Sequence, residues 1–241
     1  MSQSTLAVEW NAANDFSATV NPSGAWSYGW FNNPGDNFHL YELRQPWADC
    51  PPNQVPRWYE PIDSGTLNPS LSHNAAGTVL NCSSGNLVLQ PNDLVFHPGP
   101  NNEHSVLRWT APSAGEYFIC ATFRGRDLDG ASTDVHVFHN AIELFNCEVS
   151  GTGIPTQFVS SSLHVNADET IDFTVGYGSN NNYFNDTTAV DARIAAGAIT
   201  CQLPPVGRPS LPGWAGIALA GLLFVAGLFV FGKRRTETQK G

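Results

Sequence analysis

The sequence predicts an all-β fold class, a jelly-roll-like β-sandwich followed by one C-terminal transmembrane helix. Apolar and polar residues alternate over short runs such as "ETIDFTVG" (169–176), which is the period of a half-buried strand. Gly, Pro and Asn, which favour turns, separate these runs at short intervals. Near the C-terminus, "LPGWAGIALAGLLFVAGLFVFG" (211–232) carries no charge over a length that can cross a bilayer as a helix.

Several runs between residues 15 and 196 have the pattern of strands. In "STDVHVF" (132–138), Val135 and Val137 share one face, while Asp134 and His136 share the other. The run "EYFICATF" (116–123) is apolar on both faces and predicts a central strand, and "VFHNAIELF" (137–145) predicts a β-hairpin. We expect about eight to ten strands, as in a sandwich or barrel.

The chain divides into a body, a linker, a helix and a tail. Prolines make the segment before the helix a stiff, extended spacer. Basic residues follow the helix at once, and the positive-inside rule places them in the cytoplasm and the body outside. The predicted parts are an extracytoplasmic β-sandwich domain (1–200), a Pro-rich linker (201–212), a transmembrane helix (213–232) and a basic cytoplasmic tail (233–241).

The first residues, "MSQSTLAVEWNAANDF", lack the basic start and apolar core of a signal peptide. Export of the body therefore leads us to expect a signal-bearing start upstream of this sequence.

The body is acidic. Residues 1–207 hold six Arg, no Lys and 20 acidic residues. Nucleic-acid binding needs a basic surface, so it is excluded as a function class. The charge fits a solvated extracellular surface or one that binds cations.

The five Cys residues form no zinc-type spacing. Cys120 and Cys147 fall inside predicted strands, where they are expected to be small core residues. Cys50 and Cys82 lie in turn-rich stretches, and a disulfide between them is one of the pairings that the sequence leaves open.

His97, Asp134 and His136 are candidates for a metal or acid/base cluster. Asp134 and His136 share a strand face at i, i+2, which suits two ligands. The favoured interpretation of His97 is structural, because it precedes the fixed turn Pro98–Pro100 and can donate to a backbone carbonyl. No HExxH, GxSxG or P-loop motif occurs in the chain.

An Asp-rich stretch, "RGRDLDGASTD" (124–134), is a candidate calcium loop. Carboxylates in a flexible loop suit this ion, and the candidate ligands are Asp127, Asp129 and Asp134. The competing interpretation is a solvated turn in which Asp caps its own backbone.

Aromatic and amide side chains in loops are candidates for stacking on sugar rings and hydrogen-bonding to hydroxyls. The expected ligand-binding residues are Trp47, Trp58, Tyr177, Asn181 and Tyr183. Trp26, Tyr28 and Trp30 would share one strand face, which is more typical of a core.

Several stretches together resemble exported bacterial proteins with the PEP-CTERM type of C-terminal sorting signal. They are "NPSGAWSYGW" (21–30), "FHPGP" (96–100), "RWTAPSAGEY" (108–117), "FRGRD" (123–127), "TDVHVFHN" (133–140) and "DTTAVDARI" (186–194). The resemblance implies a secreted jelly-roll domain on a protein handled by an exosortase. The C-terminus departs from the pattern, because "GRPSLPG" stands where the Pro-Glu-Pro motif would be. The residues expected to act in sorting or anchoring are Pro209, Pro212, Trp214, Lys233, Arg234 and Arg235.

From these observations we expect a non-catalytic exported surface or matrix-associated protein that is anchored or sorted through its C-terminal helix. We expect a single-pass membrane protein with its body outside the cytoplasm, or a protein at the cell surface or secreted after C-terminal processing. Its expected partners are the membrane, exosortase-type sorting machinery and extracellular polysaccharide. Two alternatives stay open: an extracytoplasmic hydrolase acting on polysaccharide, and a structural anchor protein with no ligand.

Overall fold

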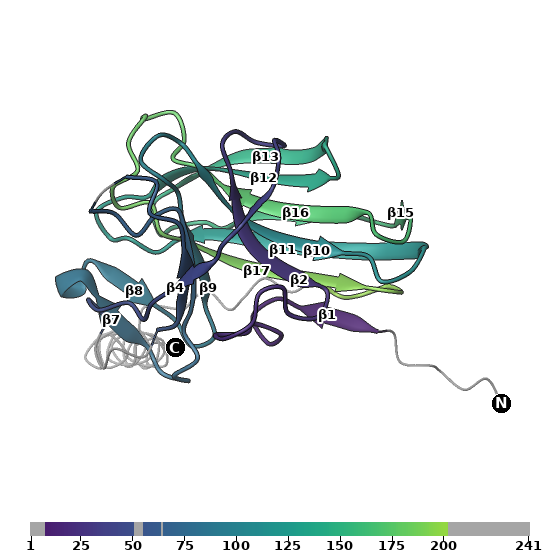
Figure 1. The fold of residues 1–241 in the computed structure, drawn as a ribbon, viewed down its shortest axis with the longest axis horizontal. Helices are drawn as coiled ribbons and strands as arrows, with labels where there is room; N and C mark the ends of the chain where they lie inside the picture. The colour runs from purple at the N-terminus through teal and green to yellow at the C-terminus, as the bar shows by residue number, and fades with distance from the viewer. Residues whose placement is uncertain (1–7, 51–54, 64, 202–241) are drawn as a thin grey trace, which may run out of the picture. The chain divides into compact units, whose positions relative to one another are not determined.

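The computed structural model describes residues 8–50, 55–63 and 65–201, which belong to one unit (Figure 1). The predicted transmembrane helix, basic tail and sorting residues (Pro209, Pro212, Trp214, Lys233, Arg234 and Arg235) lie outside the described residues, as does the linker after Cys201. Within the described part of the chain, no helix has the length and apolarity needed to span a bilayer.

The fold of this unit is all-β, as the alternating runs predicted. The larger sheet has nine strands, in the order β14-β11-β17-β9-β6-β5-β4, with β1 added to β17 and β15 added to β11. Its strands are β1 (Glu9–Asn11), β4 (Leu43–Arg44), β5 (Arg57–Tyr59), β6 (Ser70–His73), β9 (Leu94–His97), β11 (Gly115–Gly125), β14 (Thr156–Val159), β15 (Leu163–Val165) and β17 (Thr188–Ala195).

The second sheet has six strands in the order β13-β12-β16-β10-β2-β3. They are β2 (Trp26–Phe31), β3 (His39–Leu40), β10 (His104–Thr110), β12 (Ser132–His139), β13 (Ile142–Ser150) and β16 (Thr170–Val175). A separate hairpin joins β7 (Leu80–Cys82) to β8 (Leu87–Leu89) through a 3₁₀ turn, η1 (Ser83–Gly85). Pairing in both main sheets is antiparallel.

The two main sheets enclose one core, which is the arrangement of a β-sandwich. Leu107, Trp109 and Phe173 enter it from the six-stranded sheet, while Ile119 and Phe123 enter it from the nine-stranded sheet. All five side chains are fully buried. The same alternation that buries these residues turns their neighbours in the six-stranded sheet outward, away from the core.

The predicted local features are largely confirmed. The hairpin β12–β13 turns at Asn140, whose φ of 54° is a left-handed conformation that Asn tolerates. β11 lies inside its sheet between β17 and β14, as its two apolar faces predicted. Trp26 and Tyr28 are core residues, and Trp30 packs partly buried against the core, so their same-face row serves packing.

The cysteines correct part of the prediction. Cys50 and Cys82 form a disulfide, the pairing that the sequence left open. Cys120 is buried as predicted but is joined to Cys201 rather than being a free core residue. Cys147 is exposed on β13 and unpaired, so its prediction as a core residue is wrong. It lies opposite the buried Val135, but β13 is the edge strand of its sheet, and this leaves the side chain exposed.

Candidate functional site

The outward-facing side of the six-stranded sheet carries a row of mostly polar side chains on three adjacent inner strands, and we call this side the outer face. Its members are His104 and Arg108 on β10, Thr170, Asp172 and Thr174 on β16, and Asp134, His136 and Phe138 on β12. Several of them are buried although they point away from the core, because the segments 32–38 and 176–178 approach this face. Buried polar groups on one face are candidates for a binding site.

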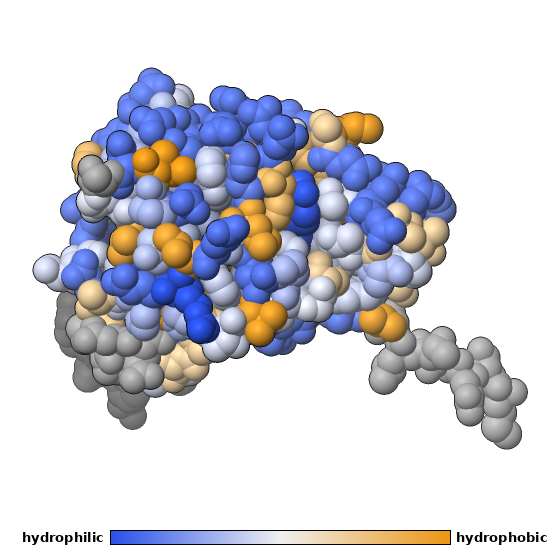
Figure 2. Space-filling view, in the orientation of Figure 1, coloured by the Kyte–Doolittle hydropathy of each residue, from blue (hydrophilic) through white to orange (hydrophobic). Residues whose placement is uncertain are grey.

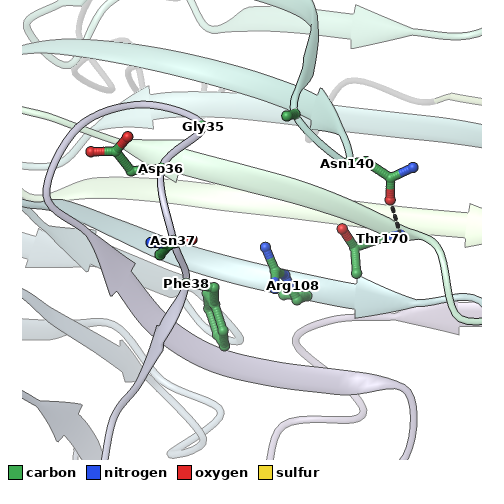
Figure 3. A pocket seen from close by; sticks show the side chains of 8 residues that line it. Gly35, Asp36, Asn37, Phe38, Arg108, Asn140 and Thr170 are labelled. Atoms are coloured by element: carbon green, nitrogen blue, oxygen red, sulfur yellow. Dashed lines mark hydrogen bonds between the residues drawn. The ribbon is translucent and has the colours of Figure 1, made fainter.

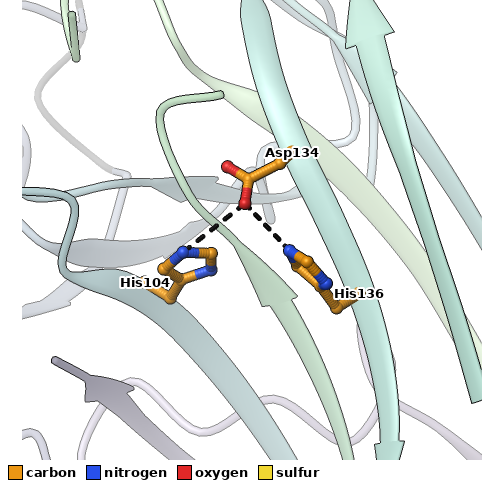
Figure 4. A group of neighbouring side chains, drawn as sticks. All are labelled: His104, Asp134 and His136. Carbon is orange, nitrogen blue, oxygen red and sulfur yellow. Dashed lines mark hydrogen bonds and ion pairs between the residues drawn. The ribbon is translucent and has the colours of Figure 1, made fainter. Parts of the chain in front are cut away.

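His104, Asp134 and His136 converge on this face (Figure 4). The His136 Nε2 atom lies 2.8 Å from Asp134 Oδ2, and His104 Nε2 lies 3.6 Å from the same oxygen. One ligand-type atom from each residue lies within 4.8 Å of the others. β10 and β12 are not neighbours, so β16, which pairs with both, sets this spacing.

Each of the three residues has a second polar contact that fixes its orientation. His104 Nδ1 faces Thr174 Oγ1 at 3.4 Å, and His136 Nδ1 lies 2.6 Å from Glu143 Oε1. The Gly178 backbone N–H donates to Asp134 Oδ1 at 2.8 Å. The ring nitrogens and the carboxylate oxygen that face one another are therefore held in place from behind.

The pKa values of the two histidines are shifted in opposite directions. Burial lowers the pKa of His104 to about 4, so its imidazole is neutral at pH 7. Burial opposes the charge on His136 as well, but hydrogen bonds to Asp134 and Glu143 outweigh it and raise the pKa of His136. Burial raises the pKa of Asp134, yet the hydrogen bond from His136 and the other favourable contacts lower it to about 2. The cluster thus combines a carboxylate, an imidazole whose neutral form is favoured (His104) and an imidazole whose pKa is raised (His136).

A groove of about 420 Å³ lies on the same outer face (Figure 3). The loop from Gly35 to Phe38 forms one side, and the turn at Asn140 and Ala141 forms the other. Arg108 and Thr170 complete the lining.

The groove lies beside the histidine cluster. A side-chain atom at Gly35 would contact the Phe138 ring, and that ring stacks on His136 with centroids 5.7 Å apart. The two features are therefore parts of one surface. In Figure 2, one face of the molecule shows hydrophobic residues only as small patches among hydrophilic ones.

Arg108 is anchored to the sheet beneath the groove. Its guanidinium donates two hydrogen bonds to Asp172, Nε to Oδ1 at 2.7 Å and Nη2 to Oδ2 at 2.8 Å. The Asp172 side chain is fully buried, whereas that of Arg108 is 23% exposed. The guanidinium also lies over the Phe38 ring, 4.2 Å from its centroid. A cation held in this way presents a fixed donor to a ligand in the groove.

His97 does not belong to the cluster, so the predicted group of His97, Asp134 and His136 is wrong in one member. His97 lies on β9 of the nine-stranded sheet, whereas the other two lie on β12 of the opposite sheet. Its Nδ1 atom instead lies 2.9 Å from the Pro98 carbonyl oxygen, which confirms the structural interpretation. The third member is His104, which shares the outward face of β10 with Arg108.

The predicted calcium ligands do not meet as a set. Asp127 is buried and accepts a hydrogen bond from the N–H of the distant Thr187 at 2.7 Å, so it is neither part of an open calcium loop nor a solvated Asp that caps its own turn. Asp129 is exposed. Among the described residues, one group of side chains could hold a metal ion, and of the predicted calcium ligands it contains only Asp134.

Asp186 lies near Asp127 and Asp134, and its environment is unfavourable for charge. It is fully buried, and its Oδ2 atom has no hydrogen-bond partner, although Oδ1 accepts from the Ser132 N–H at 2.9 Å. Burial, with the charges of Asp127 and Asp134, raises the pKa of Asp186 to about 7. The folded state therefore favours the protonated carboxyl at mildly acidic pH.

The variant Asp186→Asn is expected to flatten the pH dependence of stability. A carboxyl whose pKa is raised by folding stabilises the protein below the unfolded pKa of about 3.9, and this contribution is lost as pH rises through about 7. Near pH 8 the variant should exceed the wild type in free energy of unfolding by about 2 kcal/mol, with little gain near pH 4. Urea unfolding across this range measures it, with the exposed Asp129→Asn as control; parallel curves for Asp186→Asn and wild type would contradict it.

The predicted aromatic contact residues differ in their exposure to solvent. Trp58 is 5% exposed and its indole N–H donates to the Ser17 carbonyl at 2.8 Å, so its prediction as a contact residue is wrong. It lies on β5, which pairs with β6 and turns the ring toward Tyr28 in the core. Trp47 is half-buried in a second cluster beneath the guanidinium of Arg57.

The loop 176–186 keeps its predicted residues nearer the surface. Tyr177 and Tyr183 are half-buried and Asn181 is exposed. Tyr183 packs on Phe184, with ring centroids 4.5 Å apart, and Phe184 is 62% exposed. These residues remain a predicted contact loop beside the groove's sheet.

The sequence matches no protein-family model and no curated protein. Similar solved structures include the CBM36-1 domain of a multidomain xylanase from the hindgut metagenome of Trinervitermes trinervoides, at 10% identity and a TM-score of 0.30, over 54% of this chain and 98% of that one. Another is a family 35 carbohydrate binding module from Clostridium thermocellum, at 10% identity and a TM-score of 0.29, over 63% of this chain and 95% of that one. Likeness at this level does not identify what this chain binds.

Proposed function

We propose that this chain is a non-catalytic exported surface or matrix-associated protein that binds polysaccharide in the groove of its outer face. We further propose that its body is a jelly-roll-like sandwich, on the basis that the chain passes between the two sheets at β10–β11, β11–β12 and β16–β17. Anchoring or sorting through the C-terminal segment by exosortase-type machinery completes the proposal, and it rests on the apolar run and its basic flank.

The groove is the observation that carries the polysaccharide proposal. Sugar recognition needs polar groups that pair with hydroxyls and an apolar surface for the C–H faces of the ring. Asp36, Asn37 and Asn140 supply carboxylate and amide groups at the rim, and Arg108 supplies a fixed cation. Phe38 supplies the aromatic ring. The groove is polar and open, which suits a chain of sugars better than a small apolar ligand.

Disulfide bonding supports the exported location. Two bonds, Cys50–Cys82 and Cys120–Cys201, close loops of the body. Such bonds persist in oxidising compartments outside the cytoplasm and are rare inside it. The acidic, Lys-free body is compatible with an extracellular surface.

Phe38→Ala should weaken polysaccharide binding by about tenfold or more, because it removes the aromatic surface and one of the contacts that position Arg108 in the groove. The measurement is binding of the full chain, kept in mild detergent, to a glycan array and then to the best ligand in solution. Asn140→Ala should weaken the same interaction. Ile154→Ala, at an exposed apolar residue outside the groove lining, is the control and should bind like the wild type. Tyr183→Ala tests the predicted contact loop 176–186 separately.

Two outcomes would contradict the proposal in different ways. If Tyr183→Ala loses binding and Phe38→Ala keeps it, the contact surface is the loop and not the groove. If the wild-type chain binds no polysaccharide on the array, the proposed function itself is wrong.

A further inference from the structure

We infer that His104, Asp134 and His136 form a binding site for a first-row divalent metal ion of the Zn²⁺ type, with three protein ligands and one coordination position left to water. The inference does not depend on polysaccharide binding. It rests on the geometry, the orienting contacts and one buried ring nitrogen without a hydrogen-bond partner on the outer face.

The three ligand atoms are already near a metal-binding arrangement. Asp134 Oδ2 lies 2.8 Å from His136 Nε2 and 3.6 Å from His104 Nε2, and all three atoms fall within 4.8 Å. Ligands of a tetrahedral Zn²⁺ ion lie about 3.3 Å apart, given bond lengths of about 2.0–2.2 Å. Rotations of the side chains, without movement of the strands, would bring the ligand atoms to these distances. The ligands come from β10 and β12, held apart by β16.

The unpartnered imidazole nitrogen is an independent indication of a missing ligand. His104 is fully buried, and its Nε2 atom has no hydrogen-bond partner. Its distance to Asp134 Oδ2, 3.6 Å, is too long for a hydrogen bond. A buried polar atom without a partner is costly, and here it is aimed at the other two ligand atoms. A bound cation would satisfy it.

Gly176 keeps the space beside these atoms open. A Cβ atom at this position would collide with the His104 ring and with Asp134 Oδ1. Any other residue would therefore fill the space next to the ligand atoms. Gly176 also donates its N–H to the Asp134 carbonyl oxygen at 2.9 Å, so the backbone here is fixed.

The contacts behind the ligands have the arrangement found around protein-bound metals. Metal-binding histidines usually hold their other ring nitrogen against a carboxylate, a carbonyl or a hydroxyl. Here Glu143 Oε1 is 2.6 Å from His136 Nδ1, and Thr174 Oγ1 is 3.4 Å from His104 Nδ1. The Gly178 N–H fixes the second oxygen of Asp134. Glu143 is a positioning residue rather than a ligand.

The donor types select the ion. Two imidazole nitrogens and one carboxylate oxygen suit Zn²⁺ and its first-row neighbours. Ca²⁺ takes six to eight oxygen ligands, and Mg²⁺ keeps most of its waters, so neither fits this set. The site therefore differs from the calcium loop that the sequence predicted, although Asp134 belongs to both.

The test titrates Zn²⁺ into the full chain, kept metal-free in mild detergent, by calorimetry. We expect one Zn²⁺ per chain and a raised melting temperature, with no such effect from Ca²⁺. His104→Gln and His136→Gln should each weaken binding by about tenfold or more, and Glu143→Gln should weaken it within the range of about 10–100-fold. Co²⁺ bound in place of Zn²⁺ should show the visible absorption bands of a tetrahedral site, and His136→Gln should abolish them.

The matched control is His164→Gln, which alters an exposed pair of the same kind, His164 with Glu116 at 3.0 Å. It should bind Zn²⁺ like the wild type. The inference is overturned if the wild-type chain binds no Zn²⁺, or if both His104→Gln and His136→Gln bind it as the wild type does. If His104→Gln fails to fold, His136→Gln decides, since its side chain lies nearer the surface. Zn²⁺ binding and polysaccharide binding are measured separately, so one proposal can fail while the other is still tested.

Discussion

Replacing Arg108 with Met is expected to lower the free energy of unfolding by about 3–5 kcal/mol at neutral pH, because it leaves the fully buried Asp172 carboxylate without its partner. Burial raises the pKa of Asp172 even with Arg108 in place, and removing the cation raises it further. The loss of stability should therefore be largest above neutral pH and should shrink as the carboxyl takes up a proton in acid. Chemical denaturation across pH measures both effects.

The double variant Arg108→Met with Asp172→Leu is the control for this prediction. Replacing both partners of a buried ion pair with apolar residues of similar size is often neutral, so most of the stability should return. Polysaccharide binding should not return, because Arg108 lines the groove. A single variant as stable as the wild type would show that Asp172 finds another partner or stays protonated.

Trp109→Ala is expected to cost about 3–5 kcal/mol in free energy of unfolding, because it leaves a large cavity at the centre of the sandwich. Trp109 is fully buried, and its ring lies 5.3 Å from that of Trp10 and 4.9 Å from that of Tyr117. Urea unfolding at neutral pH measures the loss.

Trp109→Phe is the matched control. It keeps most of the ring contacts and removes the indole N–H, which is buried without a partner, so its cost should be below about 1.5 kcal/mol. Equal losses for the two variants would mean that the part of the indole ring system that Phe lacks, rather than the aromatic packing common to both residues, carries the stability. A loss below about 1 kcal/mol for Trp109→Ala would contradict the central place of this residue.

The strands could be predicted because burial on one side of a sheet imposes a period of two on the sequence. The runs at 132–138 and 169–176 correspond to β12 and β16, and the turn at Asn140 lies where the hairpin was expected. Local chemistry also predicted the role of His97 correctly, but the hydrogen-bonded turn runs from Gly99 to Asn102 rather than over Pro98–Pro100. These features depend on neighbours in sequence.

The candidate site could be predicted only in part. Asp134 and His136 were found because they lie two residues apart on one strand. His104 was missed because its place beside them depends on how β10 and β12 register against β16, which periodicity does not reveal. One signal was present: His104 shares the strand face of Arg108, which alternation turns outward.

The errors have the same physical origin. Trp58 follows a Pro-rich stretch and was expected at the surface, but pairing of β5 with β6 buries it. The groove loop from Gly35 to Phe38 is polar and shows no period, so nothing local indicated that it covers the sheet. Cys120 has a partner far along the chain, and such pairings follow from the tertiary fold.

The bond between Cys120 and Cys201 sets how the body would carry a mechanical load. A pull on the chain beyond residue 201 reaches β11 through the two sulfur atoms and bypasses β17. Without that bond, the pull would act first on β17 and would break its hydrogen bonds to β11 one residue after another, from the C-terminal end of β17. With the bond intact, the force acts on an inner strand that is paired on both sides, with β17 and with β14. Reduction of this bond would move the point of loading from β11 to its neighbour β17.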